Sequence, residues 1–455
     1  MLEPCWGLED VRVAFELESV TPLFIAGADQ RSVEGEGLRA PSLRGVLRWW
    51  FRALKATDNL RELLREEEKV FGSSLVKSRV TVRSGVKGRL KVSERMGLNV
   101  GFDEVNRRVT GEDSGVAYLL MVTAGGVVDA GRPFIEPGSR FTVDLSCDDE
   151  DVLRKVLACF WCAVYLGNFG ARARRGAGGL TISPRGGAPD YASSLTGLDF
   201  TLNKDGSRRV VDWVVENVEK AVRIVNDGEK PRGFSTRYSN LCLSRIIVSG
   251  KAWSSWKDAL NDIGKRYERY RFEHRGNYLD MAVFGLPVSH GKVTVFGRDE
   301  GGRRVDRRSS PLIFKVFRSG GSYYWGLIRL SGEFLPEGWV VTDGRVTQKP
   351  DYTAIDGFWG EVRRAGCERV LLTPLVLDEI VERVRREVNP RRIVLFGSRA
   401  RGDAHRGADI DLAVDSEKPV MREDIPVDIV WLRRTSKDVE ELMEREGVVI
   451  YEREG

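Results

Sequence analysis

Residues 397–414 read GSRARGDAHRGADIDLAV, and this stretch decides the fold of the last part of the chain. It follows the apolar run RRIVLF, and its end, ADIDLAV, alternates acidic with apolar residues. Both runs are predicted to be strands, with a helix starting at Gly397 and Ser398. Because side chains two apart on a strand share a face, Asp409 and Asp411 are predicted to point the same way.

Two carboxylates on one face repel each other unless a cation lies between them. Hard oxygen ligands favour Mg²⁺, which binds a few carboxylates together with substrate phosphates. A third acid, Asp428, lies within the apolar run PVDIVWL. A lone buried carboxylate is costly, so Asp428 is expected to join the same site. The candidate catalytic and metal-binding residues are therefore Asp409, Asp411 and Asp428.

Backbone N–H groups at the predicted helix start suit the phosphates of a nucleotide, and two arginines add positive charge beside them. The candidate nucleotide-binding residues are Gly397, Ser398, Arg399 and Arg401.

Gly-Ser, ten residues, Asp-x-Asp and a third acid on a later strand resemble the nucleotidyltransferase superfamily, in particular its minimal branch. The resemblance implies transfer of a nucleotidyl group from ATP or another nucleoside triphosphate, with Mg²⁺, to a hydroxyl. Some minimal members transfer AMP to a tyrosine of a toxin, so a toxin or other protein acceptor is one expectation. Ala408 departs from the family, in which many members carry Ser before the first Asp.

The front of the chain predicts an α+β sandwich of the ferredoxin type over residues 10–190. VRVAFELESV (11–20) alternates as a strand, and SLRGVLRWWFRALKA (42–56) has helical periodicity. VAYLLMVT (116–123) is predicted to be a further strand, and residues 150–167 an apolar helix. Cys159 and Cys162 lie in that helix and are predicted to be core thiols rather than metal ligands.

Two basic segments suggest an RNA-binding surface. Arg44, Arg48 and Arg52 form one stripe of the helix at 42–56, beside Trp49 and Trp50. Arginines on phosphates and aromatic rings under bases are typical of single-stranded RNA binding. A solvated helix face is the simpler explanation of the stripe taken alone.

The loop GNFGARARRGAGGL (167–180) combines glycines, which allow close backbone approach, with concentrated positive charge. The alternative is a flexible surface loop. The candidate RNA-binding residues of this loop are Arg172, Arg174, Arg175, Gly176 and Gly178.

TPLFIAGAD (21–29), LRAPSLRGVLRWWFRAL (38–54) and the glycine-rich loop resemble the RAMP proteins of CRISPR systems. The resemblance is to the first RAMP subunit of the type III-B Cmr effector complex, and FGLPV (284–288) and RRSSPLIFKVF (307–317) extend it to a second domain. It implies two tandem ferredoxin-like (RRM-like) RAMP domains, at 10–190 and 195–370, followed by a small α/β nucleotidyltransferase domain at 374–455. It also implies assembly with other Cmr RAMP subunits on guide RNA and target RNA, without a target-cutting role.

Composition restricts the remaining choices. The formal net charge is only +5, so an RNA site must come from local clustering of Arg and Lys. No uncharged apolar run reaches membrane-spanning length, so we expect a cytoplasmic protein with no membrane partner. Two alternatives stay open: a stand-alone RNA nucleotidyltransferase whose front domains grip its substrate, and a C-terminal domain that is catalytically inert and serves only for docking.

Overall fold

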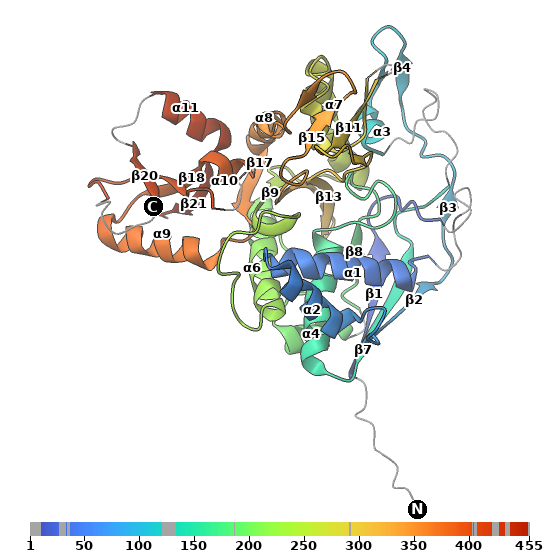
Figure 1. Cartoon of the computed structure of the whole chain (residues 1–455). Helices are drawn as coiled ribbons and strands as arrows, with labels where there is room; N and C mark the ends of the chain where they lie inside the picture. Colours follow the sequence, from blue (N-terminus) through green and yellow to red (C-terminus); the bar gives the residue numbers. More distant parts are fainter. Residues whose placement is uncertain are drawn as a thin grey trace, which may run out of the picture.

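The computed structural model describes residues 11–26, 33, 37–120, 133–185, 187–290, 293–402, 404, 407–420, 427–432 and 437–453. Figure 1 shows a body built by residues up to about 370 and a smaller unit beside it that ends at the C-terminus. Mixed helices and strands run through both, as the sequence predicts. None of the helices in these described ranges is both long and apolar enough to cross a membrane.

The first sheet is antiparallel, in the order β2-β7-β1-β8. Its strands are β1 (Val11–Ser19), β2 (Val80–Lys87), β7 (Arg140–Cys147) and β8 (Leu180–Ile182). The helices α1 (Ala40–Lys55), α2 (Leu60–Phe71), α4 (Glu150–Tyr165) and α6 (Ser207–Val225) share its core. The helical periodicity predicted for residues 42–56 is confirmed: Leu43, Leu47, Phe51 and Leu54 form an apolar stripe of α1, and all four are buried.

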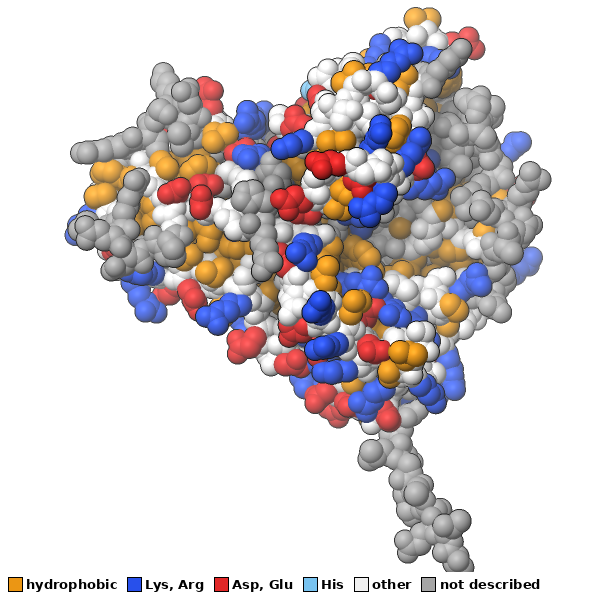
Figure 2. Space-filling model, in the orientation of Figure 1, with side chains coloured by type: hydrophobic (Ala, Val, Ile, Leu, Met, Phe, Trp, Pro, Cys, Tyr) orange, Lys and Arg blue, Asp and Glu red, His pale blue; other side chains and the backbone are white. Residues whose placement is uncertain are grey.

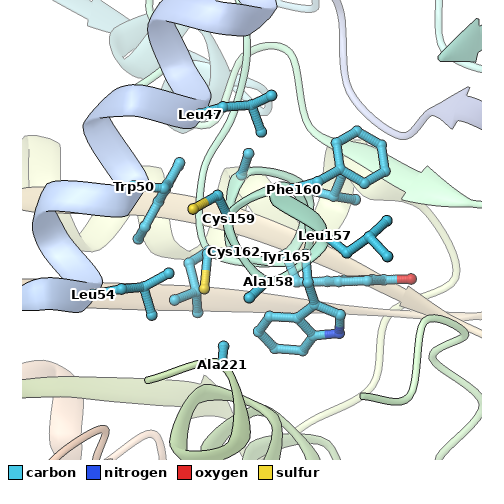
Figure 3. Close-up of a cluster of buried hydrophobic side chains, with 14 of the residues drawn as sticks. Leu47, Trp50, Leu54, Leu157, Ala158, Cys159, Phe160, Cys162, Tyr165 and Ala221 are labelled. Carbon is cyan, nitrogen blue, oxygen red and sulfur yellow. The ribbon is translucent and has the colours of Figure 1, made fainter. Parts of the chain in front are cut away.

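The CxxC pair lies in the middle of this core. Cys159 and Cys162 on α4 are fully buried among apolar side chains that include Leu47, Trp50 and Leu54 of α1 (Figure 3). Burial raises the pKa of both thiols, so they stay protonated. Their prediction as core residues is confirmed.

One predicted strand is wrong. VAYLLMVT was expected to be extended, but its described part lies in the helix α3 (Ser114–Leu120), and residues 121–123 lie outside the described residues. α3 packs against α7 (Trp256–Glu273) with Gly115 against Gly264, where a Cβ on Gly115 would lie 2.4 Å from the Lys265 backbone nitrogen. Asn261 on α7 also accepts hydrogen bonds from the first N–H groups of α3. A tertiary contact thus outweighs the local β propensity.

The second sheet is also antiparallel, in the order β13-β14-β9-β17. Its strands are β9 (Asn240–Ser249), β13 (Leu312–Ser319), β14 (Ser322–Ser331) and β17 (Gly366–Val370). Both faces are buried: Ile246 and Val248 face the first core, whereas Ile247 faces a second core formed with α3, α7 and α8 (Thr353–Arg363). β13 and β14 form a hairpin whose turn is Gly320-Gly321.

A buried lysine joins the second sheet to the C-terminal end of α4. Lys315 on β13 is 1% exposed, and its Nζ donates to Val164 O at 2.6 Å, Gly167 O at 2.7 Å and Asn168 Oδ1 at 3.3 Å. These acceptors lie at the C-terminal end of α4, where helix carbonyls lack partners and a cation is favourable. Burial lowers the pKa of Lys315 to about 7.

Smaller elements complete the body. They are β3 (Val92–Ser93), β4 (Gly101–Asp103), β5 (Arg108–Thr110), β6 (Phe134–Ile135), α5 (Ala188–Thr196), η1 (Asp280–Phe284), β10 (Val288–His290), β11 (Val293–Arg298), β12 (Arg304–Val305), β15 (Val340–Thr342) and β16 (Thr347–Gln348).

The C-terminal unit has a sheet of order β20-β19-β18-β21, in which only the β19–β20 pair is parallel. Its strands are β18 (Arg392–Phe396), β19 (Asp411–Asp415), β20 (Asp428–Trp431) and β21 (Val448–Glu452). Its helices are α9 (Leu375–Val388), α10 (Gly397–Arg401) and α11 (Lys437–Glu446). β21 was not predicted; it pairs with β18 at the edge of the sheet.

Candidate functional site

The turn after β18 fixes the position of one carboxylate. β18 ends at Phe396, which pairs with Asp411 of β19. Gly397 follows with a φ of +72°, and a Cβ at Gly397 would lie 2.1 Å from Asp411 Oδ2. The Asp411 carboxylate therefore fills the space that any side chain at position 397 would need. Glycine also adopts this left-handed backbone conformation without strain.

The acidic residues gather at the same edge of the sheet. Asp411 and Asp428 are each the first residue of their strand, and they are partners in the parallel β19–β20 pair. Both acids of Asp-x-Asp were predicted to lie in a strand. This is wrong for Asp409, which lies just before β19, whereas Asp411 is its first residue. Asp428 is exposed, not buried as expected. Its N–H donates to Ile410 O at 3.0 Å, which ties it to the same segment.

Asp411 experiences the charges of the other two acids. Its pKa is raised by partial burial, then by the carboxylates of Asp428 and Asp409, against a smaller lowering by Arg401 and Arg399. Like charges held together in this way favour a bound cation. Carboxylate oxygens are ligands that suit Mg²⁺. Among the described residues, however, no group of three or more His, Cys, Asp or Glu side chains is placed so that it could hold a metal ion.

The predicted nucleotide-binding arginines already have partners in the protein. Arg399 donates from Nε to Asp409 O at 3.0 Å and also to Ala408 O, and its guanidinium lies 3.9 Å over the Phe234 ring. Arg401 donates from Nη1 to Glu446 Oε1 at 2.9 Å. The two arginines thus hold the Asp-x-Asp segment and α11 in place. Ser398 is half-buried in α10, and its carbonyl accepts from Gly402 N–H.

Sequence reasoning missed Phe234 and Glu446, which shape this edge. Glu446 is 1% exposed at the end of α11, and Phe234 comes from the loop before β9. In the sequence, a glutamate followed by Gly447 and an apolar run indicates only an ordinary helix end, so Glu446 gave no signal of its role. Phe234 lies far away in the sequence and carries no motif.

The basic stripe of α1 is partly neutralised by α2. Arg48 and Arg52 both hydrogen-bond to Glu67, which is 1% exposed. Burial alone would raise the pKa of Glu67, but hydrogen bonds from Arg52 and Arg48 outweigh it and lower the pKa. Arg44 donates to Val80 O at 3.4 Å. The stripe therefore also has a structural role between the two helices.

The glycines of the loop at 167–180 make room for protein. A Cβ at Gly178 would lie 1.8 Å from Phe169 O, and one at Gly176 would lie 2.6 Å from Leu260 Cδ1. Both glycines are buried and have positive φ. At these two positions the glycine backbone therefore approaches other parts of the protein closely, and not a ligand.

The three arginines of the loop differ from one another. Arg172 is exposed. Arg175 lies 4.6 Å over the Tyr267 ring and donates to Phe284 O at 3.2 Å, so it packs inward. Arg174 lies 5.0 Å over the Trp49 ring, and its buried Nη1, like that of Arg175, has no hydrogen-bond partner among the described residues.

A groove of about 520 Å³ joins the loop to α1. Trp49, Arg52, Arg174, Tyr238, Arg307 and Arg308 are among its lining residues. Burial, and then the charge of Arg308, lower the pKa of Arg174 to about 10, so it remains charged near neutral pH. Figure 2 shows basic side chains gathered over this face, with acidic ones among them. Each of the two predicted basic segments contributes one arginine to this groove: Arg52 from α1 and Arg174 from the loop.

Comparisons with known proteins agree with both parts of the chain. Residues 16–181 match the RAMP superfamily, and residues 377–451 match the nucleotidyltransferase domain. The chain is 30% identical over 336 residues to the CRISPR system Cmr subunit Cmr1-1 of Pyrococcus furiosus, covering 71% of this chain and 88% of that protein. It is 36% identical over 184 residues to Cmr1-2 of the same organism, covering 37% of this chain and 93% of that protein.

The crystal structure of apo Cmr1 from Pyrococcus furiosus is similar in fold. It superposes with a TM-score of 0.52 at 24% identity, covering 80% of this chain and 99% of the other. The chain thus belongs to the Cmr1 family of RAMP proteins and carries, in addition, a C-terminal nucleotidyltransferase domain.

Proposed function

We propose that this chain is an RNA-binding subunit of a type III-B Cmr effector complex with an appended, Mg²⁺-dependent nucleotidyltransferase. It would contact guide RNA and target RNA together with other Cmr RAMP subunits. The RAMP part would form two tandem ferredoxin-like domains, at 10–190 and 195–370, one on each of the two antiparallel sheets. The transferase domain would span 374–455 and use ATP or another nucleoside triphosphate.

The groove between α1 and the glycine-rich loop supports the RNA-binding part of the proposal. Arg174 keeps a buried donor without a partner, and no carboxylate among the described residues pairs with it. A phosphate would satisfy that donor, and Trp49 and Tyr238 offer ring surfaces for bases. Arg307 is exposed at the same groove and adds charge. Of the predicted RNA-binding residues, we therefore place most weight on Arg174.

The acidic edge beside Gly397 supports the transferase part and is the observation that carries it. Three carboxylates lie where β19 and β20 begin, and the glycine holds Asp411 against the turn. In the proposed reaction an acceptor hydroxyl oxygen bonds to the α-phosphorus, the bond to the pyrophosphate breaks, and the hydroxyl proton passes to a carboxylate of this edge. Bound Mg²⁺ would be held by these carboxylates and supply positive charge for the phosphates.

One observation favours a second function for the same domain. Arg399 and Arg401 are engaged with Phe234, Ala408, Asp409 and Glu446, so they dock α10 onto its surroundings. A domain kept only for docking would make such contacts and would not need the three aspartates.

Binding of Mg²⁺ and ATP separates the two functions. In thermal unfolding, a bound ligand raises the midpoint by stabilising the folded state. We expect ATP with Mg²⁺ to raise the midpoint of the wild type and of Asp415→Asn, which alters an acid at the far end of β19, but not of Asp411→Asn. Equal shifts in all three proteins, or none in the wild type, would favour the docking function.

A further inference from the structure

A chain of buried charges connects the second sheet of the body to α10. Arg329 on β14 is 5% exposed, and its guanidinium donates to the Asp356 carboxylate on α8 and to the Arg401 carbonyl oxygen at the end of α10. Asp356 is 2% exposed. The second contact crosses from the RAMP part of the chain into the nucleotidyltransferase domain.

The Arg401 carbonyl is one of the last in α10, where helix carbonyls lack partners within the helix. A cation at that end is favourable, so Arg329 supplies both a donor and a charge. The side chain of Arg401 is fixed separately by Glu446. α10 is thus held at its last residue from two sides.

The other end of α10 is the turn that holds Asp411. The helix has only five residues, from Gly397 to Arg401, so a shift at its end would move Gly397 with it. The Asp411 carboxylate fills the side-chain space of Gly397 and would have to follow. Arg329 therefore acts on the acidic edge through one short, stiff element.

We propose that Arg329 is a positioning residue for nucleotidyl transfer, which it supports by tying α10 to the second sheet of the RAMP part. The transferase domain then depends on the body of the chain for its active geometry. This inference rests on the proposed transferase function, but the position of α10 can be measured without activity.

Arg245 provides a matched control. It is 3% exposed, lies in the same network at 3.9 Å from Asp356 and 3.7 Å from Glu368, and stacks over Trp359. Among the described residues, Arg245 makes no hydrogen bond or ion pair with α10, so its removal disturbs the buried network without releasing the helix.

The test compares the full chain in four forms: wild type, Arg329→Met, Arg329→Lys and Arg245→Met. Hydrogen exchange is measured for residues 397–402, where Gly402 N–H bonds to Ser398 O at 2.9 Å. We expect Arg329→Met to speed exchange there roughly tenfold, because loss of one charged hydrogen bond is worth at least that factor. Arg329→Lys keeps the charge but has one compact ammonium instead of the fork, so it should restore protection only in part. Arg245→Met should leave exchange at 397–402 near the wild-type rate.

Transfer from α-labelled ATP is measured on the same proteins. Arg329→Met should lower kcat roughly 10- to 100-fold with little change in KM, as expected when reacting groups are displaced by a fraction of an ångström to 1 Å. Unchanged exchange in Arg329→Met, or equal effects of Arg245→Met, would overturn the inference. A wild type that exchanges as expected but transfers no label would refute the proposed function and leave the contact between Arg329 and α10 intact.

Discussion

Substitution of Gly397 by alanine perturbs the candidate transferase site in a way that the structure quantifies. The new Cβ would lie 2.1 Å from Asp411 Oδ2, and ordinary contact begins at 3.4 Å, so the carboxylate must move by more than 1 Å. A displacement of about 1 Å already costs roughly 100-fold in rate. The positive φ adds a penalty of about 1–2 kcal/mol to folding.

Gly402→Ala separates the two effects. Gly402 has a φ of +84°, but a Cβ there would meet no atom within 4 Å. Both variants should lower the free energy of unfolding by a similar amount from backbone strain, about 1–2 kcal/mol. Only Gly397→Ala should lose transfer from α-labelled ATP by about two orders of magnitude. If the two variants transferred label equally well, the Asp411 carboxylate would not depend on the space beside Gly397.

Three further predictions concern the body of the chain. Arg174→Ala should weaken binding of single-stranded RNA and reduce the slope of log K against log salt by about 1, whereas Arg223→Ala on α6 should change neither in a filter-binding titration. Lys315→Met should lower the free energy of unfolding by about 3 kcal/mol or more, because it leaves three buried oxygen acceptors unpaired at 1–3 kcal/mol each. Burial lowers the pKa of Lys315 to about 7, so between pH 7 and about 10.4 the unfolded chain binds more protons than the folded chain. The free energy of unfolding of the wild type should therefore rise relative to that of Lys315→Met from pH 7 to pH 9, as measured by urea titration. Glu67→Gln should lower the free energy of unfolding by about 2 kcal/mol, the typical value of a hydrogen bond to a charged group, because it weakens the contact between α1 and α2. A urea midpoint equal to that of the wild type would show that the hydrogen bond from Arg52 to Glu67 does not stabilise the fold.

Local patterns were enough to predict much of the fold. The alternation of VRVAFELES and the helical periodicity of residues 42–56 correspond to β1 and α1. The strand-helix-strand pattern around Gly397 corresponds to β18, α10 and β19. Each of these elements buries a face that its own sequence periodicity defines. α3 was missed because its helix depends on Gly115 meeting Gly264, which lies 149 residues away in the chain.

The candidate sites show the same division. The positions of Gly397, Asp411 and Asp428 follow from strand register, which a short motif determines. The partners of the arginines do not, because they come from distant segments. Glu67 neutralises part of the α1 stripe, Phe234 stacks on Arg399, and Phe169 fills the space beside Gly178. Counting arginines in the sequence therefore overestimates how many can bind a ligand, because the partners that occupy them come from distant segments.

The most direct test of the account is nucleotidyl transfer by the chain assembled with guide RNA and other Cmr subunits, measured with α-labelled ATP and Mg²⁺ beside an Asp409→Asn/Asp411→Asn double variant. We expect both proteins to bind the guide RNA equally. We expect the wild type to label a protein or RNA acceptor and the double variant to label neither. Equal labelling by both proteins, or no label with any of the nucleoside triphosphates, would contradict these expectations and leave a Cmr1-family subunit with a docking domain.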